Sequence, residues 1–176
     1  MSNTNAGIWP LGYTEAGSND AGLLGREYAV MDDATTTVAG LLIKRTPSPV
    51  FVRWVKNTSG ATLAPGTIVK RDTSNNIDTD VTSASSGDTG CGVVDPRLSA
   101  SVPIGNKFLI VVKGNTNVKV QAAYSKGITV GVGTSSRALT NDKSTAALLA
   151  TAFGVLIDAS TAADQLVRAS VDFRTF

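Results

Sequence analysis

The 176-residue sequence contains no histidine. Histidine is the commonest general base, the usual partner of a nucleophilic Ser or Cys, and the commonest zinc ligand. Its absence excludes triads that use histidine, so a carboxylate pair of the glycosidase kind is the remaining catalytic option. The carboxylates, however, lie among Ser, Thr, Asn and Gly, where such side chains are normally solvated or cap turns. We therefore expect no enzymatic activity and no catalytic residue.

Cysteine is nearly absent, because Cys91 is the only one in the chain. A single cysteine excludes an intrachain disulfide and a thiolate cluster for a metal, and we interpret it as a small buried apolar residue. The adjacent Asp32 and Asp33 lack the spaced ligands of a calcium loop. Residues 131–136 are rich in Gly like a phosphate loop, but no Lys or helix pattern follows, so we assign their glycines to turns or a bulge. We expect no metal site and no cofactor.

Charge and long apolar runs are also scarce. Lys and Arg number 16 against 14 Asp and Glu, so a formal net charge of +2 is too weak to hold nucleic acid through its phosphates. The longest apolar stretch, residues 146–157, is interrupted and too short to cross a bilayer. The first residues lack the basic start of a secretion signal. We expect neither nucleic acid nor a membrane as a partner, and synthesis in the cytoplasm.

The residues that are abundant favour β-structure. Gly numbers 17, hydrophobic residues make up 42% and charged residues 17%, while Thr, Ser, Val and Ala dominate. This mixture suits pleated strands joined by tight turns better than it suits helices. A chain of this length can form one domain with an added arm, and it can bury roughly two-thirds of its unfolded surface. We predict an all-β fold.

The first 47 residues differ from the rest, because their large apolar side chains are isolated and follow no period. Such a segment has no core to offset a backbone entropy cost of about 1 to 2 kcal/mol per residue, and it is too rich in large apolar residues for a typical disordered tail. We interpret residues 1–47 as an extended arm with a Pro-rich linker, and residues 48–176 as the β-rich domain. The arm residues that we expect to bind a partner are Ile8, Trp9, Leu11, Tyr13, Leu23, Leu24 and Tyr28.

Short strand patterns begin after the linker. They span residues 50–55, 67–70 and 92–94, and each is bounded by Gly, Asn or Pro. Short strands with frequent turns predict a small β-sandwich or barrel-like domain.

The apolar run at 107–113 predicts a strand buried on both faces. Gly114 and Asn115 give a turn signal, and residues 117–120 alternate apolar and polar side chains. This pattern predicts a hairpin of two strands.

The second half of the chain shows further strand patterns at 128–130, 146–157 and 166–173. Ala-rich stretches are ambiguous by period, so a short helix at 121–126 or 144–149 is an alternative.

A short sequence repeat relates the two halves of the domain. Residues 66–69 resemble residues 127–130, and residues 91–94 resemble residues 153–156. The repeat indicates two similar β units, with chance recurrence of Gly-Val in a β protein as the alternative.

One segment resembles a known family. Residues 57–69 read NTSGATLAPGTIV, which is similar to the turn, Leu, Gly and strand opening of tailed-bacteriophage capsid decoration proteins, also called cement or head-stabilising proteins. Segments at 92–95, 111–114, 126–128 and 153–156 follow in a similar order, so the resemblance covers residues 50–176.

The resemblance implies a non-enzymatic virion protein on the outer capsid surface. It would be a homo-oligomer, with a trimer favoured, and would bridge neighbouring major capsid proteins. A tail, baseplate or fibre-associated virion protein is the first alternative. A carbohydrate-binding module is the second, although two Trp and three Tyr offer few aromatic platforms for a sugar.

Overall fold

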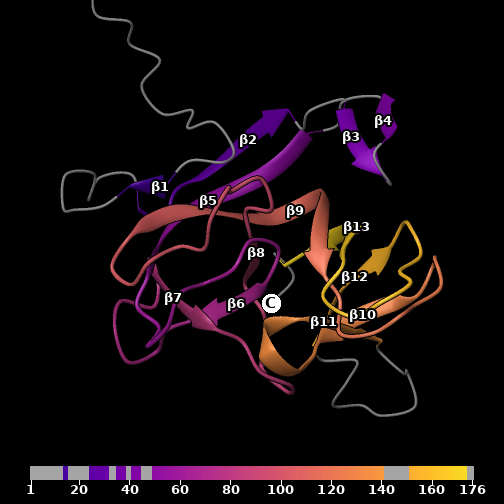
Figure 1. The fold of residues 1–176 in the computed structure, drawn as a ribbon. Helices are drawn as coiled ribbons and strands as arrows, with labels where there is room; N and C mark the ends of the chain where they lie inside the picture. Colours follow the sequence, from indigo (N-terminus) through magenta and orange to yellow (C-terminus); the bar gives the residue numbers. More distant parts are fainter. Residues whose placement is uncertain are drawn as a thin grey trace, which may run out of the picture.

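The computed structural model describes residues 14–15, 24–31, 35–38, 41–44, 49–140 and 151–173. Within them the fold is all-β, as predicted, with one 3₁₀ turn and no α-helix (Figure 1). The strands are β1 (Thr14–Glu15), β2 (Glu27–Met31), β3 (Thr35–Val38), β4 (Leu41–Lys44), β5 (Pro49–Asn57), β6 (Ile68–Arg71), β7 (Asp80–Ser83), β8 (Gly92–Val94), β9 (Lys107–Lys119), β10 (Thr129–Val132), β11 (Ala138–Thr140), β12 (Ala152–Leu156) and β13 (Leu166–Asp172). The turn η1 (Thr134–Ser136) precedes β11.

Five strands close into a small barrel. β5 pairs with β9, β9 with β8, β8 with β6 and β6 with β7, all antiparallel, and a parallel pairing of β7 with β5 completes the ring. The side chains of one core cluster fill the interior, among them Val69, Phe108 and Ile110. Gly92 makes room for them, because a Cβ at this position would lie 2.6 Å from Cδ1 of Ile110. The interior of a barrel this narrow is therefore filled by side chains.

A second layer covers the barrel. β11, β10, β12 and β13 form an antiparallel sheet that joins the C-terminal half of β9, so that Leu166 to Asp172 pair with Lys119 to Lys113. The larger core cluster lies between the layers, with Trp54 and Leu109 from the barrel strands and Phe153 from the second sheet. This arrangement explains the expected double burial of residues 107–113: alternate side chains of β9 point into the barrel and into the core between the layers.

The predicted hairpin at Gly114 is wrong. β9 continues through Gly114 and Asn115 to Lys119, because its second half pairs with β13 instead of turning back on itself. Gly114 has a φ of 115°, and a Cβ there would lie 2.9 Å from Cγ1 of Val50. The glycine therefore serves a close approach of β5 to β9 rather than a turn.

The ambiguous Ala-rich segments have different outcomes. Residues 121–126 are not helical, and the backbone of Tyr124 exchanges two hydrogen bonds with Ser160. Residues 144–149 lie outside the described residues. The part of the predicted strand 146–157 that the structure describes contains β12.

The pairing pattern of one group of strands recurs in another. The order β7-β6-β8-β9, called here the first unit, is repeated as β11-β10-β12-β13, the second unit. Val69 lies opposite Gly92 in the first unit, and Val130 lies opposite Gly154 in the second. The two units meet where β9 pairs with β13.

Parts of the segment assigned to the arm add strands. β2 pairs with β5 along its whole length, from Glu27 opposite Arg53 to Met31 opposite Pro49, and β1 pairs with the start of β9. β3 and β4 form a separate two-stranded sheet. The main sheet contains 11 strands among the described residues.

Candidate functional site

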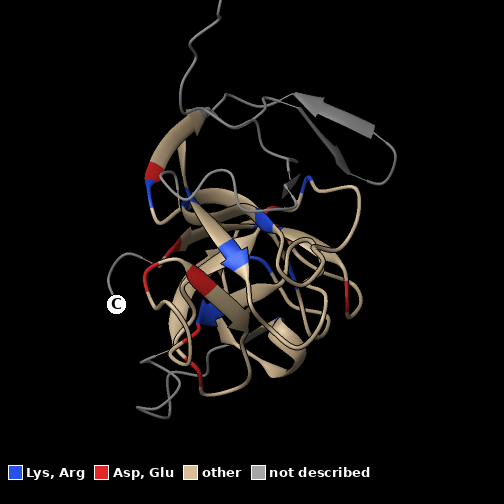
Figure 2. Ribbon diagram, turned by 90° about the vertical axis from the view of Figure 1, so that its left-hand side faces the viewer, with Lys and Arg blue, Asp and Glu red and all other residues tan. Residues whose placement is uncertain are grey.

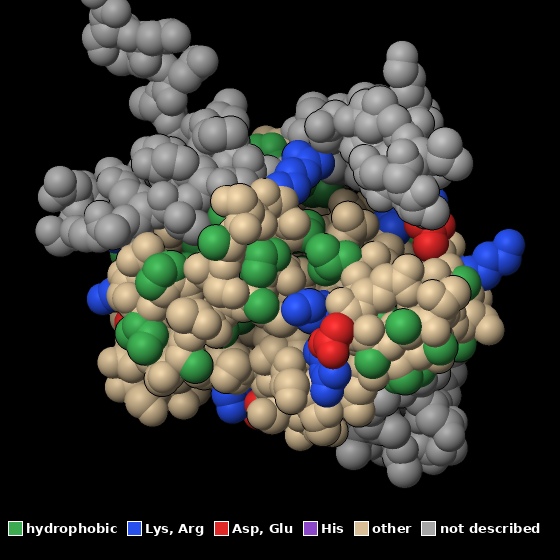
Figure 3. All heavy atoms as spheres, viewed as in Figure 1, with side chains coloured by type: hydrophobic (Ala, Val, Ile, Leu, Met, Phe, Trp, Pro, Cys, Tyr) green, Lys and Arg blue, Asp and Glu red, His purple; other side chains and the backbone are tan. Residues whose placement is uncertain are grey.

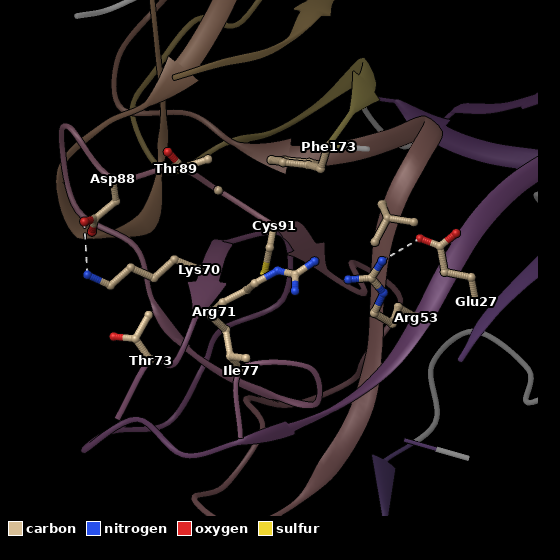
Figure 4. A pocket seen from close by; sticks show the side chains of 12 residues that line it. Glu27, Arg53, Lys70, Arg71, Thr73, Ile77, Asp88, Thr89, Cys91 and Phe173 are labelled. Atoms are coloured by element: carbon tan, nitrogen blue, oxygen red, sulfur yellow. Dashed lines mark hydrogen bonds and ion pairs between the residues drawn. The ribbon is translucent and has the colours of Figure 1, made fainter. Parts of the chain in front are cut away.

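A pocket of about 610 Å³ opens at one end of the barrel (Figure 4). Arg53 of β5, Arg71 of β6 and Val112 of β9 line it. Side chains two positions apart in a strand share a face, so Arg53 points to the same side as Val55, and Arg71 to the same side as Val69, both of which face the interior. The pocket therefore continues the interior of the barrel outward.

Basic side chains dominate the pocket. Nη2 of Arg53 lies 2.8 Å from Oε1 of Glu27, and Nζ of Lys70 lies 3.0 Å from Oδ1 of Asp88. Arg71 has a weaker contact, 3.8 Å from an Asp78 side chain that is 80% exposed and outside the pocket lining. The described lining thus contains three cationic groups and two carboxylates, which leaves an excess of positive charge.

The floor of the pocket is apolar. Burial raises the pKa of the Cys91 thiol to about 12, although Arg71 and Arg53 both act to lower it. The thiol is therefore neutral at ordinary pH, in keeping with the predicted apolar role, although Cys91 as a whole is only half-buried. Phe173 also lines the floor, and its ring stacks on Phe153 with the centroids 4.7 Å apart.

A buried asparagine holds the opposite end of the barrel. Nδ2 of Asn57 donates to the carbonyl oxygens of Val102 at 3.0 Å, of Pro103 at 3.2 Å and of Ala61 at 3.2 Å, while Oδ1 accepts from the backbone and hydroxyl of Ser59. The side chain is fully buried. Residues 57–59 match a glycosylation sequon, but the amide is committed to connecting two loops.

Asp72 organises the loop between β6 and β7. Its carboxylate accepts hydrogen bonds from Oγ1 of Thr58 at 2.6 Å, Nδ2 of Asn75 at 2.6 Å and the backbone of Ser74 at 2.9 Å. These bonds, led by that of Thr58, lower the pKa of Asp72. The carboxylate is therefore a structural acceptor that joins the end of β5 to the loop after β6.

The predicted arm anchors have two outcomes. Leu24 and Tyr28 are partly buried and pack against the core between the layers, because β2 joins the sheet beside β5. Their binding to a partner stays a prediction. The anchors that lie outside the described residues are Ile8, Trp9, Leu11, Tyr13 and Leu23.

The sequence features weighed for metal and phosphate binding have structural explanations where they are described. The register between β10 and β12 shifts after Val130, with the extra residue, Phe153, on β12 opposite the Gly-rich stretch. The stretch itself leads into the turn η1, where Oγ of Ser136 donates to the carbonyl of Ala84. Asp32 and Asp33 lie outside the described residues. In the part that the structure describes, His, Cys, Asp and Glu form no cluster of three that could hold a metal.

The face in Figure 3 shows no large region of one character among the described residues. Basic and acidic positions are interspersed along the ribbon in Figure 2, and hydrophobic side chains are scattered in small groups on the face in Figure 3. A search of the described residues for a helix long and apolar enough to span a bilayer finds none.

Sequence analysis missed the pocket because its lining comes from distant parts of the chain, from Glu27 to Phe173. One local signal was available. Arg53 interrupts the apolar run of β5 at a position that alternation directs into the barrel, and a charged residue at such a position indicates a cavity or an opening.

No family model matches the chain, and no curated protein matches it in sequence. Among solved structures, the head fiber gp8.5 N base of bacteriophage phi29 has a similar fold. The TM-score is 0.53, the sequence identity is 13%, and the match covers 70% of this chain and 95% of that one. At this identity the likeness concerns the fold.

Proposed function

We propose that this chain is a non-enzymatic structural protein of a bacteriophage virion, located at the phage head and acting by binding other protein subunits. The observation that carries the proposal is the fold likeness to a phage head fiber base, which includes 95% of that chain. The resemblance of residues 50–176 to capsid decoration proteins supports the same location independently of the fold.

A structural role agrees with the chemistry of the pocket. The chain has no histidine, and a thiol with a pKa of about 12 is a poor nucleophile at neutral pH. The carboxylates of Glu27 and Asp88 in the pocket are engaged in ion pairs. These groups therefore hold basic side chains in place instead of serving as an acid and base pair.

Within the head we propose a decoration protein on the outer capsid surface that binds the major capsid protein and assembles as a trimer. The second candidate is the base of a head fibre, which the likeness to a phage head fiber base favours. A carbohydrate-binding module is less well supported, because Trp54 is fully buried and cannot present a ring to a sugar.

The test is the location and copy number of the protein on purified particles. Phage particles are disrupted, heads and tails are separated, and the protein is quantified by mass spectrometry against the major capsid protein. We expect it on heads, in a fixed ratio to capsid subunits and at lattice positions in electron microscopy. A few copies at the base of projecting fibres would support the second candidate, and presence on tails alone would refute a head protein.

The contribution of the arm is tested by deleting residues 1–13, which removes four anchors and keeps both β1 and β2. We expect an unchanged melting temperature and a lower occupancy of heads, because a buried aromatic at an interface typically contributes about 2 kcal/mol or more. Unchanged occupancy would remove the arm from the proposed interface.

Sedimentation of the purified chain tests the proposed trimer, and a monomer at high micromolar concentration would refute it.

A further inference from the structure

Two like charges converge in the pocket at the end of the barrel. Figure 4 shows the guanidinium groups of Arg53 and Arg71 beside each other next to Cys91. Both groups are close enough to the thiol to lower its pKa, so each lies near Cys91. Two guanidinium groups repel each other, so an anion placed between them would stabilise this arrangement.

The pairings within the chain leave room for such an anion. Arg53 uses Nη2 for Glu27, but its Nε is buried and makes no hydrogen bond among the described residues. The contact of Arg71 with Asp78 is 3.8 Å long, and both side chains are exposed, at 41% and 80%. An exposed pair with this separation contributes little. The guanidinium of Arg71 is therefore accessible to a ligand, and the unsatisfied Nε of Arg53 shows that Glu27 does not satisfy all the donors of that side chain.

We propose that this pocket receives an acidic side chain from an extended segment of a partner protein, with the carboxylate between Arg53 and Arg71 and a neighbouring apolar side chain on the floor of Cys91 and Val112. Guanidinium groups match a carboxylate with two parallel hydrogen bonds each, which favours this geometry. A volume of about 610 Å³ is large enough for two such side chains and small enough to exclude a folded element.

The lining favours a peptide over a sugar or a nucleotide. Sugars and bases need an open aromatic face, but Phe173 is 5% exposed and its ring stacks on Phe153. The third cation, Lys70, is held by Asp88 at 3.0 Å and lies away from the two arginines in Figure 4. The choice of a protein as the occupant, instead of a free small acid, rests on the proposed function.

The test uses the purified full-length chain, labelled with ¹⁵N, and records the Nε–Hε signals of its arginines by NMR. The probe is the peptide acetyl-Gly-Asp-Leu-Gly-amide, and the matched control is acetyl-Gly-Asn-Leu-Gly-amide. We expect the Asp peptide to shift the signals of Arg53 and Arg71 in a saturable way at concentrations up to about 20 mM, the range of weak single-contact binding. The Asn peptide should leave them unchanged.

Variants make the assignment specific. Arg71→Gln should raise the Kd of the Asp peptide by about tenfold or more. Arg71→Lys keeps the charge but loses the two parallel hydrogen bonds of a guanidinium, so it should raise the Kd by about threefold. Lys126→Gln, an exposed change outside the pocket lining, should leave the Kd unchanged. Equal melting temperatures establish that the variants fold.

A second readout uses the single cysteine. Bound Asp peptide should slow the modification of Cys91 by excess methyl methanethiosulfonate at alkaline pH, where part of the thiol is ionised, because the peptide covers the floor. Three results would overturn the proposal: equal binding of the Asn peptide, no shift at either arginine, or tighter binding of inorganic phosphate at the same signals. None of these measurements involves phage particles, so a failure here is distinct from a failure to locate the protein on heads.

Discussion

The two units of this protein share a strand order but bury their strands differently. In the first unit β8 is buried at every position, and the first six residues of β9 are buried too, because the barrel interior lies on one side and the core on the other. In the second unit β13 alternates between buried and more exposed residues, and Val155 of β12 is 41% exposed. The first unit is closed by two parallel residue pairs between β5 and β7, whereas the second is closed by one parallel bridge between Val120, which follows β9, and Ala138 of β11.

The difference depends on β5. This nine-residue strand pairs with β9 on one edge and, through its last residues, with β7 in parallel, which closes the first unit. In the second unit β11 bridges in parallel to Val120, which follows β9, and the buried side chains of this unit share one core cluster with Trp54 and Leu109 of the barrel. Arg71 lies two residues after Val69, and the corresponding residue after Val130 is Val132, which is 1% exposed in the core. The equivalent position therefore lines a pocket in the first unit and packs in the core in the second.

The largest expected effect compares a residue buried inside the barrel of the first unit with an exposed residue of the second unit. Ile110→Ala removes a fully buried side chain from the barrel, where a large-to-small change costs about 2 to 5 kcal/mol of unfolding free energy. Val155→Ala in the second unit should cost about 0.5 kcal/mol or less, because Val155 is exposed at 41%. Urea unfolding of both variants measures the difference. Equal losses would show that the outer face of the second unit is covered in the native protein.

The next effect concerns the end of the barrel opposite the pocket. Asn57→Ala leaves the carbonyl oxygens of Val102 and Pro103 without their buried donor, so we expect a loss of about 3 kcal/mol in unfolding free energy. Asn117→Ala, at a half-buried position of β9 beside the second unit, is the matched control and should change stability by about 0.5 kcal/mol or less. A small loss for Asn57→Ala would mean that water replaces the amide.

The sequence predicted what depends on local pattern. Period-two alternation and β-branched residues placed strands at β5, β6, β8 and β13, and the continuous apolar run predicted the double burial of β9. The hairpin at Gly114 failed because a local turn signal competes with pairings to β5 and β13, which no local pattern contains. Gly114 is needed for space beside Val50, and sequence alone does not distinguish that need from a turn.

The candidate site could be predicted only in part. Its residues come from β2, β5, β6 and β9, from the loops after β6 and before β8, and from the residue after β13, and only the barrel closure brings them together. Leu24 and Tyr28 were assigned to partner binding because they have no periodic neighbours, yet β2 places them against the core of the same chain. Isolated apolar residues reveal that a surface is needed but not which surface.

A smaller effect compares equivalent glycines of the two units. A Cβ on Gly92 would meet the mobile end of the Ile110 side chain, whereas a Cβ on Gly154 would meet the backbone oxygen of Ser170. Gly92→Ala should cost about 1 to 3 kcal/mol by overpacking, and Ile110→Val, which lacks the Cδ1 atom, should restore part of it in the double variant.

Gly154→Ala should resist the corresponding rescue, because Ser170→Ala leaves the backbone oxygen in place. Urea midpoints of the single and double variants measure both couplings. Additive costs for Gly92→Ala and Ile110→Val would contradict the contact between them.

The smallest effect is a dependence of stability on pH that belongs to the first unit. The hydrogen bond from Thr58, with those from Asn75 and Ser74, lowers the pKa of Asp72 below its usual 3.8. A lowered pKa in the folded state contributes stability that is present above the unfolded value and is lost as the pH falls through the folded value. The wild-type urea midpoint should therefore decline below about pH 4, and Asp72→Asn should lower the midpoint at neutral pH and flatten the acid decline. Asp164→Asn, at an exposed position in the loop before β13, should retain the wild-type slope. If the Asp72→Asn variant also keeps the wild-type slope, another carboxylate controls the decline of the urea midpoint at low pH.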